Sequence, residues 1–115
     1  MKYQGSCHCG NIKFEVEGDI ENALSCNCSI CQRKGSLLSF FAGDQFTLLS
    51  SGENVGTYLF NKHVIEHKFC QICGINPYSE GKDPKGNRSV ALNIRCIEDI
   101  DLEKVPVTHF NGRDY

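Results

Sequence analysis

Hydrophobic and polar residues alternate in the first part of the chain in the pattern of a β-strand. Ile12, Phe14 and Val16 are apolar, and charged residues fall between them. Because successive side chains of a strand point to opposite faces, this alternation predicts a strand with one buried face. Further runs of apolar, β-branched and aromatic residues predict strands at residues 37–42, 46–49, 57–60, 64–69 and 89–94.

Turn residues separate these runs, and helical signals are weak. Residues 57–60 and 64–69 are predicted to pair as a hairpin across residues 61–63. No window of ten or more residues has convincing helical periodicity, so we expect at most a short helical turn after Cys31 and another near residues 97–101. The pattern therefore predicts a mainly β fold built from antiparallel strands.

The length of the chain limits the size of its core. With 115 residues the chain is expected to form one domain, 1–115. A domain of this size buries only about two-thirds of its unfolded surface, so the hydrophobic core is modest. The chain has no Trp, but it has eight cysteines that could supply additional cross-links. The cysteines therefore decide how the fold is held together.

The expected cellular compartment of the protein favours metal binding over disulfide formation at these cysteines. The first residues are polar and lack the apolar run of a secretory signal, and no stretch approaches the roughly 18 apolar residues of a transmembrane helix. We therefore expect a cytoplasmic protein with reduced thiols. In such a compartment, clustered cysteines are more often metal ligands than disulfides.

The charge pattern argues against two classes of partner. The formal net charge is −2, and the longest notable basic run, Arg33-Lys34, has two residues. A general nucleic-acid binder carries a basic footprint, and a membrane-surface protein carries a polybasic patch. We therefore expect neither nucleic acid nor membrane as a partner, and the sequence does not indicate an oligomeric state.

Two cysteine pairs predict a four-sulfur metal site. Cys7 and Cys9 lie two residues apart, so on an extended chain both sulfurs point to the same side. Cys70 and Cys73 form a Cys-x-x-Cys turn, whose geometry suits the roughly 3.8 Å between sulfurs that tetrahedral zinc requires. These four cysteines are predicted to hold a structural zinc ion, although iron could occupy the same ligand set.

The remaining clustered cysteines form a set of three on one short loop. Cys26, Cys28 and Cys31 would supply three protein ligands and leave one position open, which is the pattern of a catalytic zinc. A closed structural site completed by Cys96 or by a histidine is the alternative. Because Cys96 follows an apolar run, we interpret it as a small buried side chain rather than a ligand.

The order of these motifs resembles one known family. The motifs are Cys-His-Cys-Gly at residues 7–10, Cys-Asn-Cys-Ser-Ile-Cys at 26–31 and Phe-Cys-Gln-Ile-Cys-Gly at 69–74, followed by the segments 93–96 and 109–115. In this order they resemble the glutathione-dependent formaldehyde-activating enzyme family, which also contains centromere protein V. The resemblance covers nearly the whole chain and implies a β-tent fold, in which antiparallel sheets are pinned by zinc.

The resemblance also implies two zinc ions per chain, one structural and one linked to activity. It matches Cys7, Cys9, Cys70 and Cys73 to the family's structural site, and it matches the other set to the zinc site linked to activity, namely Cys26, Cys28 and Cys31. The implied reaction joins glutathione to formaldehyde as S-hydroxymethylglutathione, a carbon–sulfur lyase activity. Asn27 departs from the family, in which many members carry His, so the sequence assigns no role to this side chain.

An open three-cysteine zinc site would suit a thiol and a small aldehyde as substrates. A thiol bound at the fourth position would lose its proton and could then attack the aldehyde carbonyl. Arg33, Lys34 and Arg95 are candidate partners for glutathione carboxylates, although each is also a typical solvated surface charge. His8 is a candidate acid or base for the second site, or a simple exposed histidine.

Other functional classes remain open at this stage. A non-enzymatic zinc module that binds a protein partner would have a closed second site and would present a sheet face. A nucleic-acid-binding zinc domain is disfavoured by the acidic balance. An enzyme with a nucleophilic cysteine is disfavoured because no cysteine has a recognisable activating base in the sequence.

Overall fold

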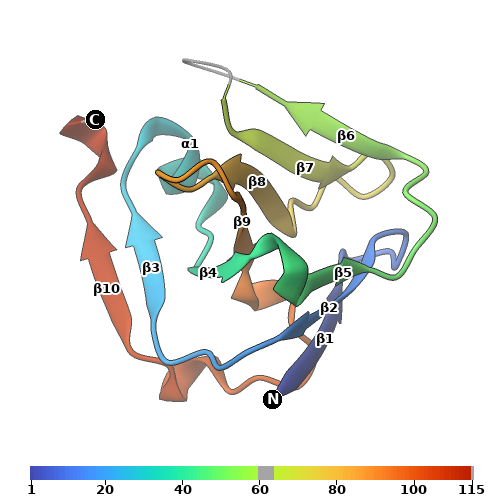
Figure 1. The fold of residues 1–115 in the computed structure, drawn as a ribbon, viewed down its shortest axis with the longest axis horizontal. Coiled ribbons are helices and arrows are strands. Elements are labelled where there is room, and N and C mark those ends of the chain that lie inside the picture. Colours follow the sequence, from blue (N-terminus) through green and yellow to red (C-terminus); the bar gives the residue numbers. More distant parts are fainter. Residues whose placement is uncertain (60–63, 115) are drawn as a thin grey trace.

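A computed structural model describes residues 1–59 and 64–114, and within these residues ten strands form two sheets. The smaller sheet has three antiparallel strands in the order β1-β2-β5. Their bounds are Lys2–Ser6, Lys13–Glu17 and Phe46–Leu48. Figure 1 shows this sheet beside the larger one, with the N-terminus at its outer end.

The larger sheet has seven strands in the order β10-β3-β4-β9-β8-β7-β6. In chain order these strands are β3 (Ala23–Cys26), β4 (Leu38–Ala42), β6 (Val55–Tyr58), β7 (Glu66–Cys70), β8 (Tyr78–Lys82), β9 (Arg88–Asn93) and β10 (Val107–Phe110). Neighbouring strands are antiparallel except for β10 and β3, which are parallel. The mainly β fold of antiparallel sheets predicted from the sequence is therefore confirmed, with this one parallel pair as an exception.

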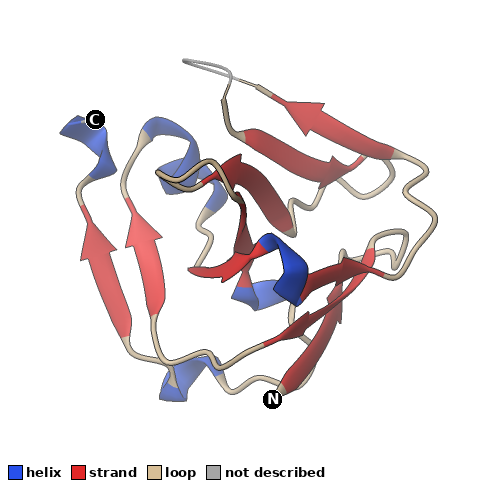
Figure 2. Ribbon diagram, in the orientation of Figure 1, coloured by secondary structure: helices blue, strands red, loops and turns tan. Residues whose placement is uncertain are grey.

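Helices are short and lie at the ends of strands (Figure 2). The α-helix α1 spans Ser29–Lys34, and Gly35 closes it in the left-handed conformation. Four 3₁₀ turns cover η1 (Gly43–Gln45), η2 (Ile94–Cys96), η3 (Leu102–Lys104) and η4 (Gly112–Asp114). Within residues 1–59 and 64–114, no helix is long and apolar enough to cross a membrane.

The core lies where the two sheets face each other. Phe14 and Val16, two of the residues that defined the first predicted strand, are fully buried in β2. The ring of Phe14 lies 5.7 Å from that of Phe46, whose ring lies 4.6 Å from that of Tyr78 in the larger sheet. Aromatic packing therefore joins the small sheet to the large one.

Several strand and helix boundaries differ from the sequence prediction. The predicted strands 57–60 and 64–69 are shifted to Val55–Tyr58 and Glu66–Cys70, and their predicted turn 61–63 lies outside the described residues. The helix expected after Cys31 instead begins at Ser29 and contains that cysteine. The helical turn expected near residues 97–101 is replaced by the flanking turns η2 and η3.

Four strands were not predicted at all, namely β1, β3, β8 and β10. β8 reads Tyr-Ser-Glu-Gly-Lys, and its glycine and charges weaken any strand signal. All four residues of β10 are exposed, so this strand lacks the alternation that a half-buried strand shows. Tertiary pairing, rather than local pattern, therefore fixes these strands.

Candidate metal centres

The first cysteine group joins the two sheets. Cys7 directly follows β1 of the small sheet, and Cys70 is the last residue of β7 in the large sheet. The sulfurs of these two residues and of Cys9 and Cys73 all lie within 4.8 Å of one another. The Sγ of Cys9 is 3.7 Å from that of Cys7 and 3.6 Å from that of Cys70. The structure thus brings together all four cysteines of the predicted structural site.

Backbone N–H groups point at the sulfurs of this group. The N–H of Ile12 donates to Cys7 Sγ at 3.2 Å. The N–H groups of Ile72 and Cys73 donate to Cys70 Sγ at 3.3 and 3.4 Å. Donors of this kind stabilise a thiolate more than a thiol, so the loops favour the deprotonated form that binds a metal ion.

Two glycines allow the chain to turn sharply around the first group. Gly10 has a φ of +87° and Gly74 has a φ of +83°, a region that side-chain-bearing residues rarely adopt. The N–H of Gly74 closes the second turn by donating to the carbonyl of Cys70 at 2.8 Å. Both turns therefore have the sharp backbone that brings neighbouring sulfurs together.

The thiols of the first group have divergent pKa values because they share one small space. Burial raises the pKa of Cys73, but backbone hydrogen bonds from Ile75 and Cys9 outweigh it and bring the pKa to about 6. The pKa of Cys9 is lowered by the Asn11 backbone, but burial and hydrogen bonds with the other thiols raise it to about 11. A bound cation is therefore needed before all four sulfurs become thiolates.

The second cysteine group is built at the junction of β3 and α1. Cys26 ends β3, Cys28 is the N-terminal cap of α1, and Cys31 lies inside the helix. Their sulfurs all lie within 4.8 Å of one another, and the N–H of Cys28 donates to Cys26 Sγ at 3.4 Å. Among residues 1–59 and 64–114, no fourth Cys, His, Asp or Glu joins this group.

The pKa values of the residues at the second group also favour binding of a cation there. Burial raises the pKa of Cys31 to about 12, and the neighbouring sulfurs of Cys28 and Cys26 contribute to that rise, against the opposing charge of Lys34. The pKa of Lys34 is lowered, because burial outweighs the opposing effect of the charges of Cys31 and Cys28. Three thiolates therefore cannot coexist here without a positive ion, and Lys34 is the side chain that already supplies part of that charge.

The C-terminal segment pairs with and hydrogen-bonds to the loop that carries the second group. β10 runs parallel to β3, and Phe110 pairs with Cys26. The side chain of Asn27 donates to Asn111 Oδ1 at 2.9 Å and accepts from the N–H of Arg113 at 3.0 Å. Asn27, to which the sequence assigned no role, thus fastens the cysteine loop to residues as far as 86 positions further along the chain.

Gly112 brings the C-terminal backbone against the second group. A Cβ built at Gly112 would overlap the Sγ of Cys26 and would lie 3.2 Å from the Cβ of Cys28. Only a residue without a side chain fits there. Gly112, Asn111 and Arg113 were missed as site residues, and their one signal was that segment 109–115 resembles a late family segment.

Replacing Gly112 with Ala should disrupt the second group and spare the first. The added methyl must displace Cys26 Sγ, so we expect metal content to fall from two ions per chain towards one. Metal analysis after dialysis checks this result. Gly86→Ala is the control, because Gly86 has a φ of +86° and open space around it, so its strain lies far from both groups. Full metal content in Gly112→Ala protein would contradict the assigned packing.

The three basic residues considered as partners for glutathione have different surroundings in the structure. Lys34 Nζ donates to Asn76 Oδ1 at 2.7 Å and faces the second group. Arg33 is exposed and donates to the carbonyl of Ser29 at 2.8 Å, and Arg95 donates to the carbonyl of Gly35 at 3.2 Å. Of these three basic residues, Lys34 is therefore the one whose pKa responds to the charges of the second group.

His8 and Cys96 do not lie with the second group. His8 lies in the turn after β1, and it is not among the residues whose ligand atoms gather at the second group. Burial raises the pKa of Cys96 to about 11, and the charges of Cys7 and Cys73 contribute to that rise. Cys96 thus lies near the first group, and it is not the fourth ligand of the second.

Similarity to known proteins agrees with this geometry. Residues 2–111 match the family described as glutathione-dependent formaldehyde-activating enzyme. The crystal structure of a protein from Rhodobacter sphaeroides is also similar, with a TM-score of 0.77 and 28% sequence identity over 94% of this chain and 100% of that chain. The family match agrees with the two cysteine groups, each of which could hold a metal ion. The chain therefore belongs to the glutathione-dependent formaldehyde-activating enzyme family.

Proposed function

We propose that the chain binds two zinc ions, one structural and one catalytic. The donor set fits zinc, because the sulfurs of each group lie within 4.8 Å of one another and tetrahedral zinc needs them about 3.8 Å apart. Cys7, Cys9, Cys70 and Cys73 would hold the structural ion. Cys26, Cys28 and Cys31 would hold the second. Keeping these thiols reduced requires a reducing compartment, so we propose the cytoplasm.

The second group supports a reaction between a thiol and a small aldehyde, which we propose to be glutathione and formaldehyde. The observation that carries the proposal is a set of three sulfurs with no fourth ligand in the described part of the chain. Zinc bound there would leave one position for a thiol and would favour loss of its proton. In the reaction the thiol sulfur forms a bond to the carbonyl carbon, the C=O π pair moves to the oxygen, and the oxygen takes up a proton.

Lys34 would stabilise the charge that develops on the aldehyde oxygen. It lies one helical turn after Cys31, and Asn76 fixes its ammonium group by a 2.7 Å hydrogen bond. Asn76 is itself held, because its side chain donates to the carbonyls of Lys68 and Tyr78. A cation held in this way can stabilise an oxyanion without first reorganising.

The proposal is tested by measuring proton release when a thiol binds. Glutathione is titrated into zinc-loaded protein by calorimetry in two buffers of different ionisation enthalpy. We expect the apparent binding enthalpy to differ between the buffers by an amount equivalent to about one proton per thiol. Cys28→Ser protein should show no such difference.

A different outcome would favour a non-enzymatic role. If neither glutathione nor a small thiol binds, and spectroscopy of the cobalt-substituted protein shows four protein ligands at the second group, the enzyme proposal fails. The domain would then be better described as a zinc module that binds a protein partner.

A further inference from the structure

Three of the four arginines in the chain lie around α1, the helix that carries part of the second group. Arg33 belongs to the helix itself. The guanidinium of Arg95 donates to the carbonyl of Gly35, which closes the helix, at 3.2 Å. The guanidinium of Arg113 donates to Gln32 within the helix at 2.6 Å. Because a guanidinium presents several N–H donors in one plane, it is well suited to bind carboxylates.

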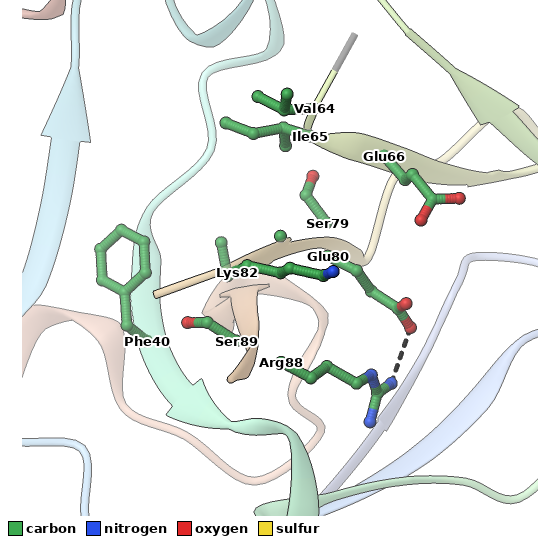
Figure 3. Close-up of a pocket in the computed structure, with 11 residues that line it drawn as sticks. Phe40, Val64, Ile65, Glu66, Ser79, Glu80, Lys82, Arg88 and Ser89 are labelled. Carbon is green, nitrogen blue, oxygen red and sulfur yellow. Dashed lines mark hydrogen bonds and ion pairs between the residues drawn. The ribbon is translucent and has the colours of Figure 1, made fainter. Parts of the chain in front are cut away.

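These three arginines form no ion pair with any side chain that the structure describes. Their hydrogen bonds end on neutral carbonyl or amide oxygens. The fourth arginine, Arg88, differs from them. It lines a cavity on the large sheet and donates to Glu80 at 2.7 Å, which Figure 3 shows as a dashed line. Glu80 already neutralises Arg88, so the arginines around α1 are better placed to bind an added carboxylate.

Arg113 is tied directly to the loop that carries the three sulfurs. A Cβ at its neighbour Gly112 would overlap one of these sulfurs, so the backbone here touches the second group. The N–H of Arg113 donates to Asn27 Oδ1 at 3.0 Å within the cysteine loop. Its guanidinium contacts Gln32, which lies four residues after Cys28 and therefore on the same face of α1. Both the backbone and the side chain of Arg113 are thus fixed at the second group.

The other two arginines make their contacts further from the sulfurs. Arg33 lies two residues after Cys31, and on a helix with about 3.6 residues per turn two such residues point to nearly opposite sides. Arg95 contacts the C-terminal end of the helix, whereas Cys28 caps its N-terminal end. Arg113 is therefore the arginine whose contacts place it at the cysteine loop itself.

An anionic substrate at the second group needs positive charge close to it. The three thiolates outweigh the charge of one divalent zinc ion, and glutathione brings two carboxylates in addition to its thiol. Without cations beside the site, the like charges would repel each other. Lys34 faces the sulfurs and is assigned to the aldehyde oxygen. Arg113 uses one guanidinium N–H for Gln32, and its remaining guanidinium N–H groups donate to no described residue, so they can bind a carboxylate.

We propose that Arg113 binds the glycine carboxylate of glutathione and thereby determines the specificity of the second group for this thiol. The inference rests on the proposed function, because the thiol sulfur would take the open position at the three cysteines. The glycine carboxylate is the better candidate because fewer bonds separate it from the sulfur than separate the γ-glutamyl carboxylate, and the backbone beside Arg113 touches Cys26. Gln32 is a neutral amide, so it orients the guanidinium without neutralising its charge.

The inference is tested by removing each partner of the expected ion pair in turn. Glutathione and its glycine ethyl ester, which keeps the thiol but lacks the glycine carboxylate, are titrated by calorimetry into zinc-loaded wild-type and Arg113→Gln protein. We expect Arg113→Gln to weaken the binding of glutathione about fivefold and to leave that of the ester unchanged. A purely structural role for Arg113 would weaken both ligands equally, and that result would overturn the inference.

Two further variants separate a direct contact from a general effect of charge. Gln32→Glu places a carboxylate against the guanidinium of Arg113 without removing it, so it should also weaken glutathione and spare the ester. This variant tests the inference even if Arg113→Gln loses its second metal ion. Arg33→Gln is the matched control, since it removes the same charge from the opposite side of α1 and should bind glutathione as the wild type does. An equal loss of glutathione binding in Arg33→Gln and Arg113→Gln would overturn the inference.

A glutathione derivative without a thiol proton separates this inference from the proposed function. S-methylglutathione keeps both carboxylates, and we expect Arg113→Gln to weaken its binding about fivefold as well. If Arg113→Gln weakens S-methylglutathione in this way but glutathione releases no proton when it binds the wild type, the proposed reaction fails and the carboxylate contact stands. If glutathione releases its proton and binds wild-type and Arg113→Gln protein equally well, the inference about Arg113 fails and the proposed function stands.

Discussion

Replacing Cys73 with Ser is expected to leave the protein unfolded or insoluble. Cys73 belongs to the group whose members come from both sheets, so a metal ion bound there ties β1 to β7. A structural zinc site can contribute on the order of 10 kcal/mol to folding, and small domains are stable by only about 5–15 kcal/mol in total. Loss of this site should therefore remove most of the stability. Circular dichroism and thermal unfolding of the purified variant measure it.

Two further cysteine variants serve as comparisons for this result. Cys96→Ser makes the same chemical change near the first group without removing a member of it, so it should stay folded and keep both metal ions. Cys28→Ser removes a member of the second group, which lies within one end of the large sheet, so more of the fold should survive. A well-folded Cys73→Ser protein with an unchanged melting temperature would refute the structural assignment of the first group.

The sequence was sufficient to predict those parts of the molecule that depend only on residues close together in the chain. The alternation at Phe14 and Val16 predicted a strand with one buried face, and both side chains are fully buried. The spacing within each cysteine motif is also local, because a turn of three or four residues sets where two sulfurs point. This is why the spacing of Cys70 and Cys73 is enough to identify them as a pair, and their sulfurs do lie together.

The features that complete the second site depend on contacts between distant residues, so the local pattern of residues could not reveal them. Asn27 bonds to Asn111 and Arg113, which lie more than 80 positions away. The parallel pairing of β10 with β3 brings those residues together, and β10 itself has no strand-like alternation. An asparagine between two cysteines gives no sign of such a partner, because its side chain can bond to the backbone in many local turns.

The same long-range contacts explain how a short loop can hold three sulfurs in place. α1 has only six residues, and a helix that short is not stable alone. Asn27 links the loop before it to the C-terminal segment, and Arg113 Nη2 donates to Gln32 Oε1 at 2.6 Å within the helix. The second group is therefore positioned by β3 on one side and by the C-terminal segment on the other.

Cys28→Ser is expected to reduce thiol-dependent formaldehyde consumption to the uncatalysed background. Cys28 supplies one of only three sulfurs at the second group, and two sulfurs are a poor ligand set for zinc. We expect the catalysed excess to fall by more than about 100-fold, since losing a metal's second-shell partner alone costs roughly 10- to 100-fold. The rate is measured as loss of formaldehyde at fixed pH with glutathione.

The uncatalysed reaction between thiols and formaldehyde is fast, so the measurement depends on matched controls. Cys96→Ser protein at the same concentration carries the same number of cysteines as Cys28→Ser protein, and it should retain the wild-type excess over background. Because the two variants have equal thiol content, any difference between them cannot come from formaldehyde reacting with surface cysteines. An equal excess in both variants would show that the second group does not catalyse the reaction. It would then be a structural site, and the function would lie in a partner bound elsewhere on the sheets.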